Sequence, residues 1–148
     1  MPRIAEISIA IKYATSDQKK DPDFMLNSIR SASKDNIETV SEEVMKHAHP
    51  DLKKDQKFLL RVIEAATYID PSKIMEYIPS NLKNDPEFMF NAIERNPRAV
   101  KCIGIFLKSN PAFILKANEI TPIVRECIDA SLKSNPVFMS ELAKKVSY

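Results

Sequence analysis

The stretch KNDPEFMF at residues 83–90 decides the fold, because the chain carries it in five related copies. The other copies are KKDPDFML (19–26), KKDQKFLL (53–60), KSNPAFIL (108–115) and KSNPVFMS (133–140). Their shared pattern is K-x-[DN]-P-x-F-[MIL], with Gln56 replacing the proline in the second copy. Such a period, here 25 to 34 residues, is typical of repeat proteins, whose units bury their apolar faces against their neighbours.

Each copy of the motif has the residues of a helix start. Asp or Asn at the N-cap accepts hydrogen bonds from the first backbone N–H groups, and proline follows at N1, where its missing N–H costs nothing. The phenylalanine begins an apolar stripe on one side of the helix, as in Phe88, Met89, Ala92 and Ile93. The motif therefore predicts helices, which we call A helices, near 22–32, 56–68, 86–95, 111–118 and 136–146.

A second helix, the B helix, fits between successive motifs. Its start is marked by Asp70-Pro71, Asn96-Pro97 and Thr121-Pro122. The segment 1–15 is predicted as a leading helix with Ile7 and Ile11 in register, although Ile7 to Ile11 also alternate like a strand. The predicted B helices lie near 36–48, 72–78, 97–107 and 122–132.

These elements predict an all-α fold of about ten helices. We expect a right-handed stack of short helical hairpins, like an α-solenoid, forming a single domain over residues 1–148. Its repeats start near residues 21, 55, 85, 110 and 135. Four copies have an apolar residue two positions after the phenylalanine, whereas the last copy has Ser140, which suits a terminal repeat with one neighbour fewer.

Composition excludes several classes of function. The single glycine, Gly104, cannot build a P-loop, a dinucleotide-binding turn or a nucleophile elbow, because each needs several glycines. With 22 basic and 20 acidic residues the net charge is +2, so no strong field attracts nucleic acid. No apolar run is long enough to span a membrane, and the two cysteines are expected to stay reduced in a cytoplasmic compartment.

The repeated L-K-x-D-P-x-F-M-x-x-A-I, clearest at Leu82–Ile93, resembles the helical repeat called domain of unknown function 4116. The resemblance covers roughly residues 17–143. It implies no activity, since the family has none assigned. It implies a context instead: such repeats occur in proteins of protists, giant viruses and intracellular bacteria, including effectors injected into host cells. The B helices depart from the family's usual pattern.

The exposed side of the A helices is the candidate partner-binding face. We define this A-helix face by the third and sixth positions after each motif phenylalanine, whose residues differ from copy to copy while the capping and core positions repeat. Such variation suits a specific protein surface, although an ordinary solvated face has the same pattern. The predicted partner-binding residues are Arg61, Glu64, Asn91, Glu94 and Arg95.

The motif lysines form a second candidate ladder, with Lys53, Lys83 and Lys108 in its middle copies. They could bind phosphate or an acidic partner, or they could complement the negative C-terminal ends of the preceding B helices. Cys102 and Cys127 lie one repeat apart and are interpreted as buried core thiols.

No catalytic, metal-binding or cofactor-binding constellation emerges. On a helix, residues two apart such as His47 and His49 would point to different sides, so we do not expect them and Asp51 to form a metal site. We therefore predict a non-catalytic protein–protein interaction module, as a bacterial effector or a regulator or inhibitor of another effector enzyme. The alternative is the targeting or substrate-recognition portion of a larger enzyme. We expect no cofactor, no nucleic acid, a monomer or weak dimer, and a cytoplasmic protein or one secreted into a host cytosol.

Overall fold

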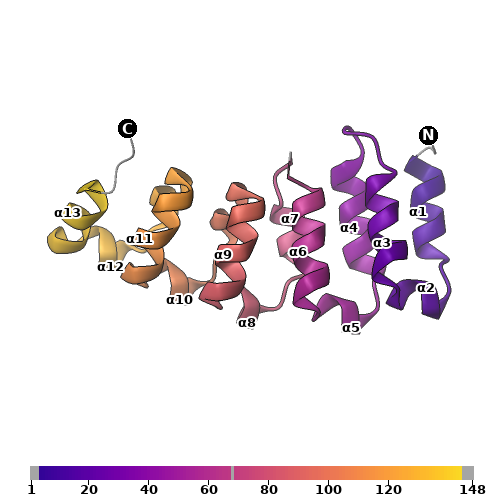
Figure 1. Cartoon of the computed structure of the whole chain (residues 1–148), viewed down its shortest axis with the longest axis horizontal. Coiled ribbons are helices and arrows are strands. Elements are labelled where there is room, and N and C mark those ends of the chain that lie inside the picture. Colours follow the sequence, from indigo (N-terminus) through magenta and orange to yellow (C-terminus); the bar gives the residue numbers. More distant parts are fainter. Residues whose placement is uncertain (1–3, 68, 145–148) are drawn as a thin grey trace. The chain divides into compact units, whose positions relative to one another are not determined.

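The computed structural model describes residues 4–67 and 69–144, and their regular structure is entirely helical (Figure 1). The described residues form thirteen α-helices and two 3-10 helices, with no strand among them, so the all-α prediction is confirmed and the leading segment is helical. Chain contacts divide these helices into two compact units, Met1–Pro79 and Ser80–Tyr148. The handedness of the stack and its continuity along the whole chain stay predictions.

The first unit contains two rows of packed helices. In one row the A helix α3 packs against the A helix α6, and in the other α1 packs against α4, which packs against α7. α3 also contacts α4, which joins the two rows. The elements of this unit are α1 (Ile4–Lys12), α2 (Ser16–Lys20), α3 (Pro22–Arg30), α4 (Ile37–His47), α5 (Pro50–Lys53), α6 (Gln56–Ala65) and α7 (Ser72–Met75).

The second unit repeats this arrangement. The A helices α9, α11 and α13 pack in that order, while η1 packs against α9 and against η2, and η2 packs against α11. The elements are α8 (Ser80–Lys83), α9 (Pro86–Arg95), η1 (Pro97–Cys102), α10 (Ile105–Lys108), α11 (Pro111–Ile120), η2 (Pro122–Cys127), α12 (Ala130–Lys133) and α13 (Pro136–Lys144).

The motif starts the A helices as predicted. The Asp85 carboxylate accepts from the backbone N–H groups of Glu87 and Phe88 at 3.0 and 3.4 Å, and Asn135 caps α13 in the same way. The helices expected over 22–32 and 56–68 end earlier, at Arg30 and Ala65. Residue 68, residues 1–3 of the leading helix and residues 145–146 of the last A helix lie outside the described residues.

The continuous helices predicted over 97–107 and 122–132 are wrong. Each segment is a six-residue 3-10 helix followed by a separate one-turn α-helix, and the break falls at a buried isoleucine with extended backbone, Ile103 or Ile128. The backbone N–H of Gly104, which would continue the first helix, instead donates to the Lys83 carbonyl at 2.8 Å. A hydrogen bond to the preceding repeat thus replaces the one within the helix. The B helix predicted over 72–78 shortens to α7 for its regular part.

Five short helices, which the sequence did not predict, account for the count of fifteen rather than about ten. They are α2, α5, α8, α10 and α12, and each directly precedes an A helix. Between repeats they are joined through the motif lysines, because the Lys19 carbonyl accepts from the His49 N–H at 3.0 Å and the Lys108 carbonyl from the Asp129 N–H at 3.0 Å. Each repeat therefore consists of a one-turn helix, an A helix and, where present, a B helix.

Candidate functional site

The predicted partner-binding residues belong to two A helices in different units. Arg61 and Glu64 lie on α6 of the first unit, whereas Asn91, Glu94 and Arg95 lie on α9 of the second. Their environments within the two units differ, although Arg61 and Asn91 stand at one repeat position and Glu64 and Glu94 at another.

In the first unit, Arg61 and Glu64 line a hollow of about 280 Å³ between α3, α4 and α6. We call it the arginine hollow. Its apolar part is made by Ile29, Ile37 and Ala65, and its charged part by Arg30, Arg61 and Glu64. Arg30 stands at the sixth position after Phe24 and Arg61 at the third position after Phe58, so adjacent A helices bring different positions of the repeat together.

The two guanidinium groups of this hollow have only weak partners among the described contacts. Arg61 Nη2 lies 3.7 Å from Asp23 Oδ1, and these side chains are 44% and 72% exposed, so solvent screens the ion pair. Arg30 Nη1 donates to Asn27 Oδ1 at 3.4 Å. A guanidinium has five N–H donors, so donors remain on both groups for a carboxylate of a ligand.

In the second unit, two of the three predicted residues support their own helix. Asn91 Nδ2 donates to the Glu87 carbonyl at 3.0 Å, and Arg95 Nη1 donates to the Asn91 carbonyl at 2.9 Å. Glu94 is exposed. The A-helix face of this unit is therefore organised by local bonds along α9 rather than by a charged hollow.

An aromatic cluster on the second unit was not foreseen. The Phe90 ring stacks on the Phe113 ring with centroids 4.6 Å apart and planes 21° apart, and Lys116 Nζ lies 4.6 Å from the Phe90 centroid. Lys116 occupies the third position on the A-helix face, but its ammonium group covers a ring, an interaction worth about 0.5–1 kcal/mol. The signal was Phe90 itself, which stands where three other copies have leucine.

Lys53 agrees with the structural interpretation of the lysine ladder. Its Nζ donates to the Lys46 carbonyl, in the last turn of the B helix α4, at 3.2 Å, and lies 5.8 Å from the Tyr77 ring centroid. The ammonium group thus complements a helix C-terminus. The motif lysines nevertheless all lie within the one-turn helices rather than at the ends of the B helices.

The histidines have structural contacts. His47 Nε2 lies 3.2 Å from Glu43 on the same helix, and His49 is the N-cap of α5, where its Nδ1 accepts from the Asp51 N–H at 3.1 Å. Within residues 4–67 and 69–144, no cluster of three or more His, Cys, Asp or Glu side chains could hold a metal ion.

The two cysteines are less buried than the sequence predicted. Both are half-buried rather than buried, because they stand at or near the ends of 3-10 helices, and neither is in a disulfide. Burial raises the pKa of the Cys127 thiol, and Glu126 raises it further, while Lys108 and Lys101 act in the opposite direction less strongly than burial does.

Alkylation should report this shift at Cys127. In a Cys102→Ser variant, we expect iodoacetamide to modify Cys127 more slowly in the folded chain than in urea, because less thiolate is present at a given pH. The midpoint of the rate–pH profile should lie higher for the folded chain. Since folding raises this pKa, the thiol's contribution to stability should be fully present below the ordinary thiol pKa and should be lost as the pH rises from there through the raised pKa of the folded chain. Coincident pH midpoints in the two states would contradict the shift.

Comparison with known proteins supports the repeat and gives no activity. Residues 69–108 match a family described as Domain of unknown function (DUF4116), which confirms the resemblance over α7, α8, α9, η1 and α10. Searches of curated proteins and of solved structures found no match. Among the described helices, none combines the length and apolar character that a membrane crossing requires.

Proposed function

We propose that this chain is a non-catalytic interaction module that binds another protein through the A-helix face of its first unit. The observation that carries the proposal is the arginine hollow. Its apolar part can take an aliphatic or aromatic side chain, while Arg30 and Arg61 can make bidentate bonds to a carboxylate. Arginine is one of the residue types enriched among those that dominate the binding energy of protein interfaces.

The hollow also favours a particular partner chemistry. Two arginines and Glu64 leave one net positive charge around an apolar recess, so an acidic side chain next to an apolar one is the complementary feature. The family resemblance is the reason to seek the partner among host proteins or other effectors. A regulator or inhibitor of an effector enzyme fits the same surface.

Two sets of variants test the face once a partner has been captured from source-cell or infected-cell lysate. We expect Arg30→Ala with Arg61→Ala to weaken the purified complex at least about tenfold, because each truncation removes a charged hydrogen bond. Lys54→Ala with Lys57→Ala is the matched control, since it removes the same charge from exposed positions of the first unit outside the hollow. Isothermal titration calorimetry gives both dissociation constants.

If the partner instead binds the motif lysines, the opposite result is expected. If Lys53→Ala, Lys83→Ala and Lys108→Ala together abolish binding while the arginine variant binds normally, the face is wrongly assigned. Binding through the lysines would also weaken steeply with salt.

A further inference from the structure

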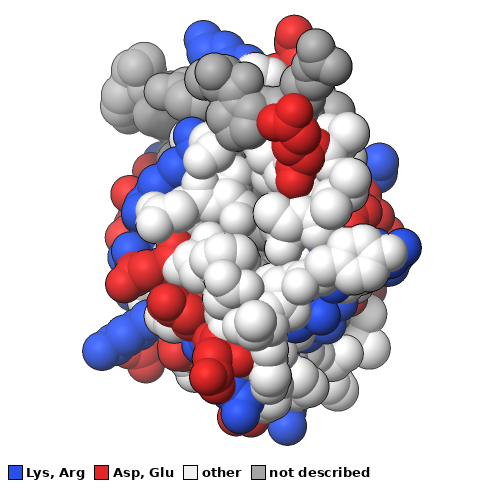
Figure 2. Space-filling model, turned by 90° about the vertical axis from the view of Figure 1, so that its right-hand side faces the viewer, with Lys and Arg blue, Asp and Glu red and all other residues white. Residues whose placement is uncertain are grey.

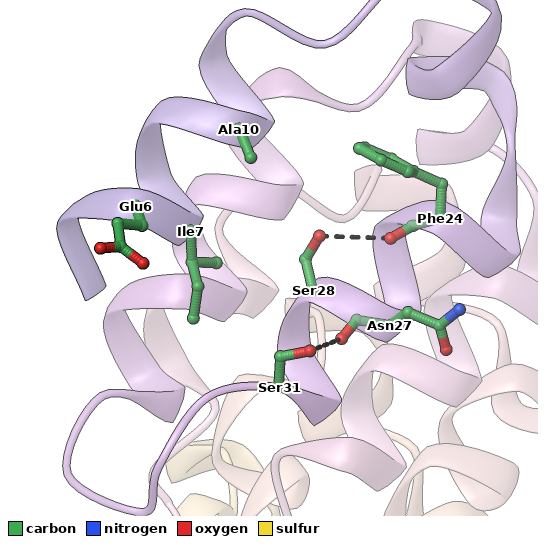
Figure 3. A pocket seen from close by; sticks show the side chains of 7 residues that line it. All are labelled: Glu6, Ile7, Ala10, Phe24, Asn27, Ser28 and Ser31. Atoms are coloured by element: carbon green, nitrogen blue, oxygen red, sulfur yellow. Dashed lines mark hydrogen bonds between the residues drawn. The ribbon is translucent and has the colours of Figure 1, made fainter. Parts of the chain in front are cut away.

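Each unit carries an apolar hollow against a helix whose repeat partner is missing among the described residues. The N-terminal hollow, of about 270 Å³, lies between α1 and α3 and is lined by Glu6, Ile7, Ala10, Phe24, Ser28 and Ser31 (Figure 3). The C-terminal hollow, of about 300 Å³, lies beside α13 and is lined by Arg125, Ile128, Lys133, Met139, Leu142 and Ala143.

Inside the units, a helix occupies each of the positions that correspond to these two hollows. It is an A helix in the first case and a B helix in the second. Inside the second unit, the A helix α9 packs against both η1 and the next A helix, α11. The N-terminal hollow is bounded in the same way, by α1 in the row of B helices and by the A helix α3, so an A helix fits it. The B helix η2 packs against the preceding B helix, η1, and against the A helix α11. In the C-terminal hollow, η2 and α13 hold the positions of η1 and α11, so a B helix fits this hollow.

The N-terminal hollow therefore fits an A helix such as α13, and the C-terminal hollow fits a helix of the B row such as α1. Within residues 4–67 and 69–144, α1 lies in the B row without an A helix before it, and α13 is an A helix without a B helix after it. We propose that α13 of one copy occupies the N-terminal hollow of a second copy, while α1 of that second copy occupies the C-terminal hollow. Together, α13 of the first copy and α1 of the second form the A and B helices of one repeat, so the two copies join head to tail. This proposal is independent of the A-helix face.

The surfaces of the two hollows have the apolar character that such a contact requires. In the N-terminal hollow, the Ala10 methyl group and the Phe24 ring point into the space, while the Ser28 and Ser31 hydroxyls donate to the carbonyls of Phe24 and Asn27 (Figure 3). These hydroxyls are thus satisfied within α3. Outside the two hollows, the same helices expose further apolar side chains: Ile9 and Tyr13 on α1 are 58% and 73% exposed, and Val137 on α13 is 72% exposed.

The surface around α1 is also largely uncharged. Figure 2 shows uncharged side chains running down the middle of this side, with basic and acidic groups mostly at its margins. A capping helix in a repeat protein normally presents a polar outer face, whereas α1 exposes Ile9, Ala10 and Tyr13. Exposed apolar patches of this kind mark interaction sites.

Charge selects a head-to-tail contact over pairing of like ends. The N-terminal hollow carries the acidic Glu6, and the C-terminal hollow carries Arg125 and Lys133. Joining unlike ends places opposite charges together, whereas joining like ends places equal charges together. Because this contact uses different surfaces on the two copies, it leaves one hollow open at each end and allows further copies to add.

Sedimentation velocity of the full chain tests the proposal. Between about 10 µM and about 1 mM, the average mass should rise beyond that of a dimer as concentration rises. Ala10→Arg and Ala143→Arg each place a charge in one hollow, at exposed helical positions that accept arginine. Each variant alone should associate at least about tenfold more weakly than the natural chain. Ala112→Arg, at an exposed position of α11 outside both hollows, is the matched control and should associate normally.

Mixing the variants gives the decisive result. Ala10→Arg retains an intact C-terminal hollow and Ala143→Arg an intact N-terminal hollow, so an equimolar mixture should form a one-to-one complex that grows no further. Far-UV circular dichroism checks that each variant is folded. A natural chain that stays monomeric throughout the range, or Ala143→Arg alone dimerising as strongly as the natural chain, would overturn the proposal.

If either substitution unfolds the chain, charge reversal provides the second test. Glu6→Lys and Lys133→Glu should each weaken association, and the double variant should recover it because the opposite charges are restored in exchanged positions. A double variant weaker than both single variants would also overturn the head-to-tail contact.

Discussion

Phe88→Ala should lower the free energy of unfolding by about 3–5 kcal/mol, because it removes a fully buried ring from the core of the second unit and leaves a cavity. Phe88 is 1% exposed and starts the apolar stripe of α9 together with Met89, Ala92 and Ile93, all of which are buried. Urea titration followed by far-UV circular dichroism measures the loss.

The other motif phenylalanines provide matched controls, because they occupy the same repeat position. Phe138→Ala should cost less, since α9 packs against both α11 and the B helix η1, whereas α13 packs against α11 and has no B helix after it among the described residues. Phe24→Ala should also cost less, because Phe24 is only half-buried and lines the N-terminal hollow. Equal losses at all three positions would contradict the repeat packing described within the units.

Gly104→Asp should destabilise the chain by about 1–2 kcal/mol, because the new Cβ atom forces the Asn84 side chain to rotate away and give up its cap on α10. A Cβ atom on Gly104 would lie 1.9 Å from Asn84 Oδ1. That oxygen accepts from the Phe106 N–H at 3.1 Å, in the first turn of α10. Asn84 thus supplies the N-cap oxygen that Gly104, the N-cap residue of α10, lacks.

Asn84→Ala alone should cost about 1 kcal/mol, the usual loss for a removed N-cap. When Asn84→Ala is combined with Gly104→Asp, the introduced carboxylate has the space that Asn84 occupied. It can then cap α10 as Asp129 caps α12, where the Asp129 side chain accepts from the Ser131 N–H at 3.1 Å. The double variant should therefore be more stable than Gly104→Asp. Thermal melts of the four chains form a double-mutant cycle, and additive losses would contradict the exchange of caps.

Asp129, the natural N-cap of α12 with which the Gly104→Asp side chain is compared, is charged. Hydrogen bonds from the Ser131 hydroxyl and N–H lower the pKa of the Asp129 carboxyl, so Asp129 caps α12 as a carboxylate. Because folding lowers this pKa, its stabilising effect is present above the ordinary carboxyl pKa and is lost as the pH falls through the lowered value. The Gly104→Asp comparison therefore belongs near neutral pH.

The sequence by itself determined the A helices and which residues face their core. The N-cap, proline and phenylalanine act within one turn of the chain, so local chemistry was sufficient to predict where α9 and α11 begin. The same periodicity placed Arg61 and Glu64 on the exposed side of α6. Local patterns could not indicate that Arg30 lies beside them, since that contact depends on the packing of α3 against α6.

Only the tertiary structure decided how the segments between A helices fold. The one-turn helices have four or five residues, too few for a periodic pattern, and their N-caps differ: Thr15, His49, Gly104 and Asp129 share no start signal. Their positions follow from bonds between repeats, such as the Gly104 N–H to the Lys83 carbonyl. Packing also left the hollows beside α1 and α13 open, because each helix lacks, among the described residues, the neighbour that fills the equivalent space inside a unit.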